Sequence, residues 1–224
     1  MKNMGRLAIT ILAVSFSAAN LWAANADAER LKAATETLAE LQTKISKDLA
    51  SKAVCAIVVP SLKKGGFIIG AKYGRGFASC RNDNGGWSAP AGMRIEGGSF
   101  GLQIGGSGSD VVILVMNKSG MEKLLKSKFT LGGDASVAAG PVGREGDAQT
   151  DALMHAEMLT WAKSKGAFAG ISLDGSTMRP DDEANKELYG ASATNPQILM
   201  GKFPIPDDAK AFVTALGNFS PHKA

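Results

Sequence analysis

The chain contains Val54-Cys55-Ala56-Ile57-Val58-Val59-Pro60, an apolar and β-branched run that ends at a proline. Such a run is typical of a strand. It is followed by Lys63-Lys64-Gly65-Gly66, which predicts a turn, and then by Phe67-Ile68-Ile69-Gly70, which begins a second strand. Two neighbouring strands joined by a turn are therefore expected here.

Glycine is concentrated in the residues that follow. The chain has 27 glycines in 224 residues, and 20 of them lie between Gly65 and Gly146. This density argues against a helical bundle and favours many short strands with tight turns. Gly74–Gly76 is predicted to be a kink or turn, and further strands are predicted at 77–81, 87–95, 99–104, 111–116, 129–131, 135–139 and 166–173.

A helix is predicted over Asp27–Lys52, where apolar residues recur every three or four positions. They are Leu31, Ala34, Leu38, Leu41, Ile45 and Leu49. The apolar face of this helix can pack on the domain, which is the usual arrangement, or lie on a membrane. Shorter helices are predicted at 119–125, 180–188 and 206–216, while residue propensity favours a helix at 151–163.

The composition is that of a globular protein. Hydrophobic residues make up 45% and charged residues 21%, which is too apolar for a disordered tail and too charged for a polytopic membrane protein. No repeat or linker is visible. We predict one α+β domain, mostly antiparallel β with a sheet that can close into a barrel, an N-terminal amphipathic helix and short C-terminal helices.

The first 26 residues have the three-part pattern of a secretory signal peptide. Lys2 and Arg6 precede an apolar run over 7–24, and Ala24-Asn25-Ala26 is a small-residue cleavage site. A membrane anchor is the alternative reading. Because Cys55 is the first cysteine, no lipoprotein is expected. We therefore expect a periplasmic or secreted protein with a signal peptide at 1–26, a helix at 27–52 and a β-rich domain at 53–217.

Export would place the two cysteines in an oxidising compartment. Cys55 and Cys80 are an even pair in an oxidising compartment, so a disulfide between them is predicted. The alternative is two buried thiols on strands that do not touch.

Positive charge is gathered in one part of the chain. Residues 53–81 hold five basic residues and no acid, whereas residues 131–224 hold 12 acids and 8 bases. The five are Lys63, Lys64, Lys72, Arg75 and Arg81. They can form a patch that attracts anions or an anionic bilayer, or they can be solvated strand ends and turns.

Motifs for other chemistry are absent from the sequence. The glycines at 70–76 and 105–109 lie between predicted strands, whereas a nucleotide-binding loop leads into a helix. Of the two histidines, His222 lies near the C-terminus and His155 has no nucleophile motif to serve. Asp181-Asp182-Glu183 fits the acidic first turn of a helix better than a metal site.

A series of short motifs runs from Lys52 to Gly175. They are Ser51–Pro60, Lys64–Gly70, Tyr73–Gly76, Gly86–Pro90, Gly97–Gly105, Asp110–Asn117, Leu131–Asp134, Ala139–Arg144 and Ser164–Gly175. In their order and density they resemble the SYLF domain family, which is known for binding phospholipids and, in fungal members, actin. The resemblance implies a pair of strands at 153–163 and 166–173, and it implies no catalytic residues.

Together these features predict non-catalytic binding of anionic phospholipid or another amphiphile in the cell envelope. The alternative is an envelope scaffold whose glycine-rich, actin-binding-like β surface binds another protein without lipid. The candidate lipid-binding residues are Lys63, Lys64, Lys72 and Arg75, with the helix residues Arg30, Lys32, Lys44 and Lys47 as a second set. No enzymatic activity, cofactor, metal or nucleic-acid partner is expected.

Overall fold

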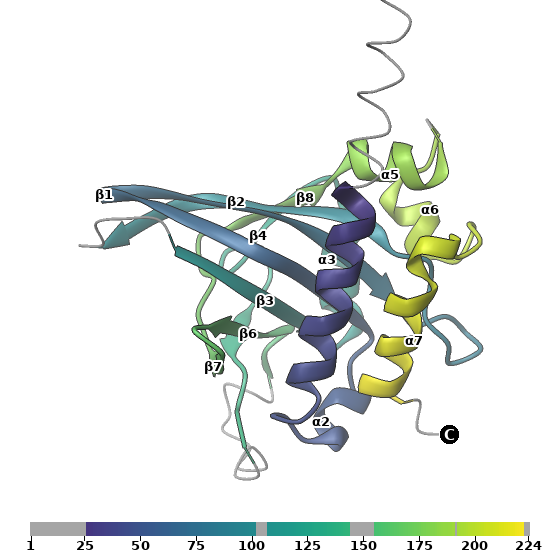
Figure 1. Ribbon diagram of the computed structural model, residues 1–224, viewed down its shortest axis with the longest axis horizontal. Helices are drawn as coiled ribbons and strands as arrows, with labels where there is room; N and C mark the ends of the chain where they lie inside the picture. The colour runs from purple at the N-terminus through teal and green to yellow at the C-terminus, as the bar shows by residue number, and fades with distance from the viewer. Residues whose placement is uncertain (1–25, 102–106, 144–154, 191, 222–224) are drawn as a thin grey trace, which may run out of the picture.

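The centre of the fold is one long strand that doubles back on itself. The computed structural model describes residues 26–101, 107–143, 155–190 and 192–221, and β1 (Cys55–Cys80) has 26 residues. A straight strand of that length would span roughly 85 Å, yet the Cα atoms of Cys55 and Cys80 lie 4.0 Å apart. The two predicted strands are therefore the two halves of a hairpin within β1 (Figure 1).

The two halves of β1 pair with different neighbours. The first half is antiparallel to β3 (Ser107–Val115), with Cys55 opposite Val115. The second half is antiparallel to β2 (Ala91–Gly101), with Ala78 opposite Ala91. The hairpin thus forms the middle of a continuous sheet.

Short strands extend this sheet on both sides, in the order β4-β8-β2-β1-β3-β6-β5, and β7 also pairs with β6. They are β4 (Phe129–Thr130), β5 (Val137–Ala139), β6 (Met158–Ser164), β7 (Ala167–Gly170) and β8 (Thr177–Pro180). Among the described strands, β5 and β6 form the one parallel pair. The predicted α+β, mostly antiparallel fold is confirmed, and the sheet curls into a half-barrel (Figure 1).

Both faces of the central sheet are buried. Cys55, Ile57 and Val59 contribute to one hydrophobic cluster, while Ala56 and Val58 contribute to the other. Alternate residues of a strand point to opposite faces, so a strand covered on both sides needs a continuous apolar run. This explains why residues 54–59 lack polar side chains.

Two helices cover one face of the sheet side by side, the N-terminal helix over 26–41 and α7 (Lys210–Phe219) (Figure 1). Leu31, Ala34, Leu38 and Leu41 are at most 1% exposed and join the same cluster as Val58. The apolar face of the N-terminal helix therefore packs on the domain. In the described part of the chain, no helix has the length and hydropathy needed to cross a membrane.

The predicted single helix over 27–52 is divided in two. After the helix over 26–41 the chain turns, and α2 (Lys47–Ser51) begins at Ser46. The Ser46 side chain accepts a hydrogen bond from Leu49 N at 3.1 Å, which is the action of an N-cap residue. Periodic apolar residues continue through this break because Ile45 is also buried, at 8% exposure.

The glycines at 74–76 form no turn, contrary to the prediction. They lie within the second half of β1, and a Cβ at Gly76 would overlap the Val58 carbonyl oxygen. Glycine is therefore required here for close approach of the two halves of the hairpin. The predicted strands at 87–95 and 99–104 are parts of one strand, because β2 runs without a break from Ala91 to Gly101; residues 102–104 lie outside the described residues.

The remaining helices lie at the ends of strands. They are α3 (Lys118–Leu124), α5 (Asp182–Tyr189), α6 (Asn195–Leu199) and the 3₁₀ turn η2 (Asp207–Ala209) before α7. α3 follows the N-cap Asn117, and α7 continues through Gly217. The observed bounds of both helices therefore differ from the predicted ranges 119–125 and 206–216. Residues 158–164 form strand β6, as the resemblance implied, although the propensities of these residues favour a helix.

Candidate binding surface

Three of the predicted lysines gather near the turn of β1. Lys63 and Lys64 lie on its first half, and Lys72 lies on its second half. We call this region the tip, defined as residues 61–72 of β1, 97–101 of β2 and 107–109 of β3. In Figure 1 the tip projects away from the helices that cover the rest of the sheet. The tip contains these three lysines and no Asp or Glu.

Lys72 is the most buried of the three lysines, at 9% exposure. Its stem crosses Gly97, where an added Cβ would lie 2.9 Å from Lys72 Cε. Burial lowers the pKa of Lys72, and the charge of Lys64 lowers it further, against an opposing effect of Asp174. An anion beside Lys64 and Lys72 would therefore relieve an existing repulsion.

Arg75, the fourth predicted residue, lies in a separate cluster of arginines around a buried carboxylate. It is opposite Arg94 of β2, and both guanidinium groups donate to Asp181, whose side chain is 1% exposed. The distance from Arg94 Nη2 to Asp181 Oδ1 is 2.7 Å. The exposed Glu183 pairs with both arginines, at 3.0 Å from Arg94 and 3.6 Å from Arg75.

The Asp181 carboxylate is held in its charged form by this cluster. Burial would raise the pKa of Asp181, but the hydrogen bonds and charges of Arg94 and Arg75 outweigh burial and keep that pKa below its ordinary value. Asp181 is also the N-cap of α5. The sequence placed Asp181 at a helix start but did not indicate Arg94, because their contact depends on the pairing of β2 with β8.

The second set of predicted residues does not form one patch. Arg30 pairs with Asp27; burial lowers the pKa of Arg30, and the charge of Arg75 lowers it further, so Arg30 faces the arginine cluster. Lys32, Lys44 and Lys47 are exposed. Lys44 and Lys47 lie beyond the far end of the N-terminal helix, roughly 20 Å from Arg30.

A cleft of about 690 Å³ lies beside β2 and β8, in a region that the sequence did not indicate. Its lining includes Arg94, Lys126, Arg179, Asp182 and Glu183. Both arginines are engaged by carboxylates, and Arg179 Nη2 lies 2.6 Å from Glu96 Oε1. With three cationic and two anionic side chains in its lining, the cleft is close to charge balance and favours neither sign of ligand.

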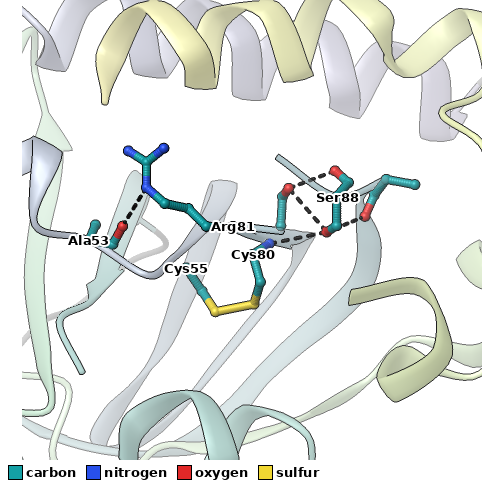
Figure 2. The surroundings of a disulfide bond; sticks show 7 residues. Ala53, Cys55, Cys80, Arg81 and Ser88 are labelled. Atoms are coloured by element: carbon teal, nitrogen blue, oxygen red, sulfur yellow. Dashed lines mark hydrogen bonds between the residues drawn. A yellow bond between two sulfur atoms is a disulfide. The ribbon is translucent and has the colours of Figure 1, made fainter. Parts of the chain in front are cut away.

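The predicted disulfide between Cys55 and Cys80 is confirmed (Figure 2). It joins the two ends of β1, and both residues are fully buried. Next to it, Cys80 N donates to Ser88 Oγ at 3.1 Å and Arg81 Nε donates to Ala53 O at 3.0 Å, as Figure 2 shows. The fifth basic residue of 53–81 is thus committed to the base of the hairpin.

The acidic and imidazole groups of the described residues are dispersed or structurally engaged. No three His, Cys, Asp or Glu side chains of the described ranges come together as a metal site requires. His155 is exposed, and the nearby Glu157 accepts hydrogen bonds from Ser119 Oγ and from Ser136 N, the latter at 2.7 Å. His222 lies outside the described residues.

Comparison with known proteins points to one family. The family described as "Ysc84: Las17-binding protein actin regulator" matches residues 96–219. The SH3 domain-containing YSC84-like protein 1 of Rattus norvegicus is 36% identical over 165 residues, which cover 73% of this chain and 48% of the relative.

Two fungal relatives match a similar share of the chain. An SH3 domain-containing protein of Schizosaccharomyces pombe is 34% identical over 165 residues, covering 72% of this chain and 38% of the relative. Protein YSC84 of Saccharomyces cerevisiae is 31% identical over 173 residues, covering 74% and 37%. The chain thus spans less than half the length of these relatives.

Proposed function

Because this chain belongs to the Ysc84 (SYLF) family, we propose that it is a non-catalytic binding protein whose partner is an anionic phospholipid surface. The family is described as an actin regulator and is not a known enzyme family. The observation that carries this proposal is the tip. Lys63, Lys64 and Lys72 belong to the tip, whose own residues include no Asp or Glu; the nearest acids are Asp110, which accepts from Ser61 N, and Asp174, whose charge acts on Lys72. The other predicted arginines, Arg30 and Arg75, are already paired with carboxylates.

The tip is suited to a surface rather than to a compact anion. Lys63 is exposed and Lys64 is half-buried, and as consecutive residues of one strand they lie on opposite faces of the thin end of the sheet. Each basic residue close to an anionic membrane contributes about 1 kcal/mol of attraction, which salt weakens. Three lysines therefore support weak, salt-dependent attachment to a bilayer.

A protein partner is the second candidate, and the comparisons favour it. The family description names a protein, Las17, and an actin regulator. Co-sedimentation with vesicles separates the two candidates. Binding that rises with the fraction of anionic lipid and falls with added salt supports the lipid surface, and retention in the supernatant under all of these conditions supports the protein partner.

Charge reversal at the tip tests the lipid proposal directly. We expect the double variant Lys63→Glu/Lys64→Glu to bind anionic vesicles at least about tenfold more weakly than the wild type, because two attractions become repulsions. The loss should be greatest at low ionic strength. The measurement is co-sedimentation across a salt series, with thermal unfolding to show that both proteins are folded.

The matched control is Lys186→Glu/Lys202→Glu. Both lysines are exposed and lie on the side of the molecule where α5 and α6 are found, away from the tip (Figure 1). Lys163 would be a poor control because it forms an ion pair with Glu40 of the N-terminal helix, at 2.5 Å. Equal losses in the two double variants would contradict a role for the tip.

We also propose that the protein works after export, in the periplasm or outside the cell. The support is the N-terminal sequence. Residues 1–25 lie outside the part of the chain that the structure describes. The expected result of N-terminal sequencing of exported protein is a chain that begins at Asp27, after the Ala24-Asn25-Ala26 site. A soluble protein that still begins at Met1 would overturn the export proposal.

A further inference from the structure

The cleft of about 690 Å³ beside β2 and β8 is separate from the tip. Its lining comes from the end of α3 and the loop after it, from the end of β8, and from the first turns of α5 and α6. Small-molecule sites usually have volumes of about 300–1,000 Å³. The cleft is therefore large enough to hold a small ligand.

Two opposite charges in the lining of the cleft are unpaired. Lys126, in the loop after α3, and Asp182, in the first turn of α5, are both exposed. Within the described ranges, neither side chain forms an ion pair or a hydrogen bond with another residue, and the two do not pair with each other. A cation and an anion that share a cleft without meeting are complementary to a ligand that carries both charges.

The other charged groups of the lining are already engaged. Arg94 and Glu183 belong to the cluster around Asp181, and Arg179 donates to Glu96 at 2.6 Å. Their charges are largely compensated by these partners. Lys126 and Asp182 therefore remain as the two groups that a charged ligand can pair with in the cleft.

The neighbours of the two unpaired charges suit the same kind of ligand. Ser127 follows Lys126, and its exposed hydroxyl has no hydrogen-bond partner in the described part of the chain. It can act as a second donor to a carboxylate. Leu125, Pro180 and Pro196 are half-buried and give the lining an apolar part. A ligand with charged ends and an apolar middle would find a partner for each of its parts.

We propose that this cleft binds a small zwitterion, an amino acid or a short peptide, with its carboxylate at Lys126 and Ser127 and its ammonium group at Asp182. The near balance of charge in the lining gives no preference for an anion or a cation alone. The same balance is what a molecule with one charge of each sign requires. This site is independent of the tip and does not depend on the proposed lipid surface.

A series of L-alanine peptides tests the site and measures the separation of its two charges. Alanine, dialanine and trialanine have the same charged ends, and each added residue moves these ends apart by up to about 3.5 Å. We expect one member to bind more tightly than the others and to shift the amide NMR signals of residues 125–127 and 182–183. Acetylation of its amino end, or amidation of its carboxyl end, should each weaken binding about fivefold by removing one ion pair.

Two variants assign the ends of the ligand. Lys126→Ala should bind the free peptide no better than its C-terminal amide, and Asp182→Asn should bind it no better than its N-acetyl form. The matched controls are Lys202→Ala and Asp208→Asn, because both residues are exposed and neither lines the cleft. The controls should retain both preferences of the wild type. Thermal unfolding shows that each variant is folded.

The possible failures are distinguishable. An absence of shifts at 125–127 and 182–183 with every peptide would overturn the proposal. Equal binding of free and blocked peptides, or a preference that depends on one end alone, would show that the cleft does not select a zwitterion. Loss of both preferences in the controls would place the ligand elsewhere. None of these results bears on vesicle binding, so the proposed function is tested separately by Lys63→Glu/Lys64→Glu.

Discussion

Replacing Asp181 with alanine is expected to lower the free energy of unfolding by about 3–5 kcal/mol, the usual cost of removing one partner from a buried charge pair. Asp181 is fully buried, and the side chains of Arg75 and Arg94 are 25% and 18% exposed. Without the carboxylate, these two guanidinium groups would face each other across β1 and β2. The variant also removes the N-cap of α5, where Asp181 Oδ1 accepts from Ala184 N at 3.4 Å.

Glu183→Ala is the matched control for this prediction. Glu183 pairs with the same two arginines, but its side chain is 73% exposed. Exposed ion pairs contribute about 0–1 kcal/mol, so this variant should unfold close to the wild type in urea. Similar losses for Asp181→Ala and Glu183→Ala would show that burial of the carboxylate does not determine its contribution.

The effect of Asp181 should depend on pH in a defined direction. Because the folded-state pKa of Asp181 is below its ordinary value of 3.8, the unfolded chain binds the proton more readily. The stabilisation by Asp181 is therefore present above that ordinary value and disappears as pH falls through the folded-state pKa. The difference in unfolding free energy between wild type and Asp181→Asn should narrow below about pH 4, and a constant difference would contradict this origin.

Removal of the disulfide is expected to have the next largest effect. The double variant Cys55→Ala/Cys80→Ala should lose roughly 3 kcal/mol of unfolding free energy, according to the chain-entropy estimate for the loop that the bond closes. The two cysteines are 25 positions apart. This bond holds the base of β1, whose two halves form the middle of the sheet, so its loss should favour the unfolded state of the whole domain.

The burial of the two cysteines provides a control that needs no mutation. Both residues are fully buried, so a reductant should reach the disulfide only when the protein unfolds. Oxidised wild-type protein should release no thiol to a thiol reagent in denaturant, and it should resist reduction under native conditions. Two reactive thiols in exported, denatured protein would show that the bond does not form. Rapid reduction of native protein would show that β1 opens without global unfolding.

Several strands could be predicted from the sequence because they depend on local chemistry. The continuous apolar run at 54–59 indicated a strand, and the structure adds that its alternate residues contribute to two different hydrophobic clusters. The apolar stripe of the N-terminal helix likewise indicated a buried face. Element boundaries were less accurate, since the helix ends near residue 41 and restarts at Lys47 through a local cap at Ser46.

Segments whose structure depends on distant partners were predicted poorly. The residues of β6 favour a helix by propensity, yet they form a strand because Val111–Val115 of β3 pairs with them over Met158–Ala162. β8 and α6 were not predicted at all. The Gly74–Gly76 segment suggested a turn, but its glycines serve the close approach to Val58. In each case tertiary contacts outweigh local preference.

For the basic residues, too, local sequence identified some features and tertiary contacts decided the others. Local sequence was sufficient to identify the acid-free run over 53–81, the pair Cys55 and Cys80, and the family resemblance. Which of the cations remain available was decided by the tertiary structure alone. Arg75 is neutralised by Asp181, 106 positions away in the chain, whereas Lys63 and Lys64 project with the tip. The physical reason is that the field at a charged group depends on every charge and every apolar atom packed around it, and strand pairing brings these neighbours from parts of the chain that no local pattern connects.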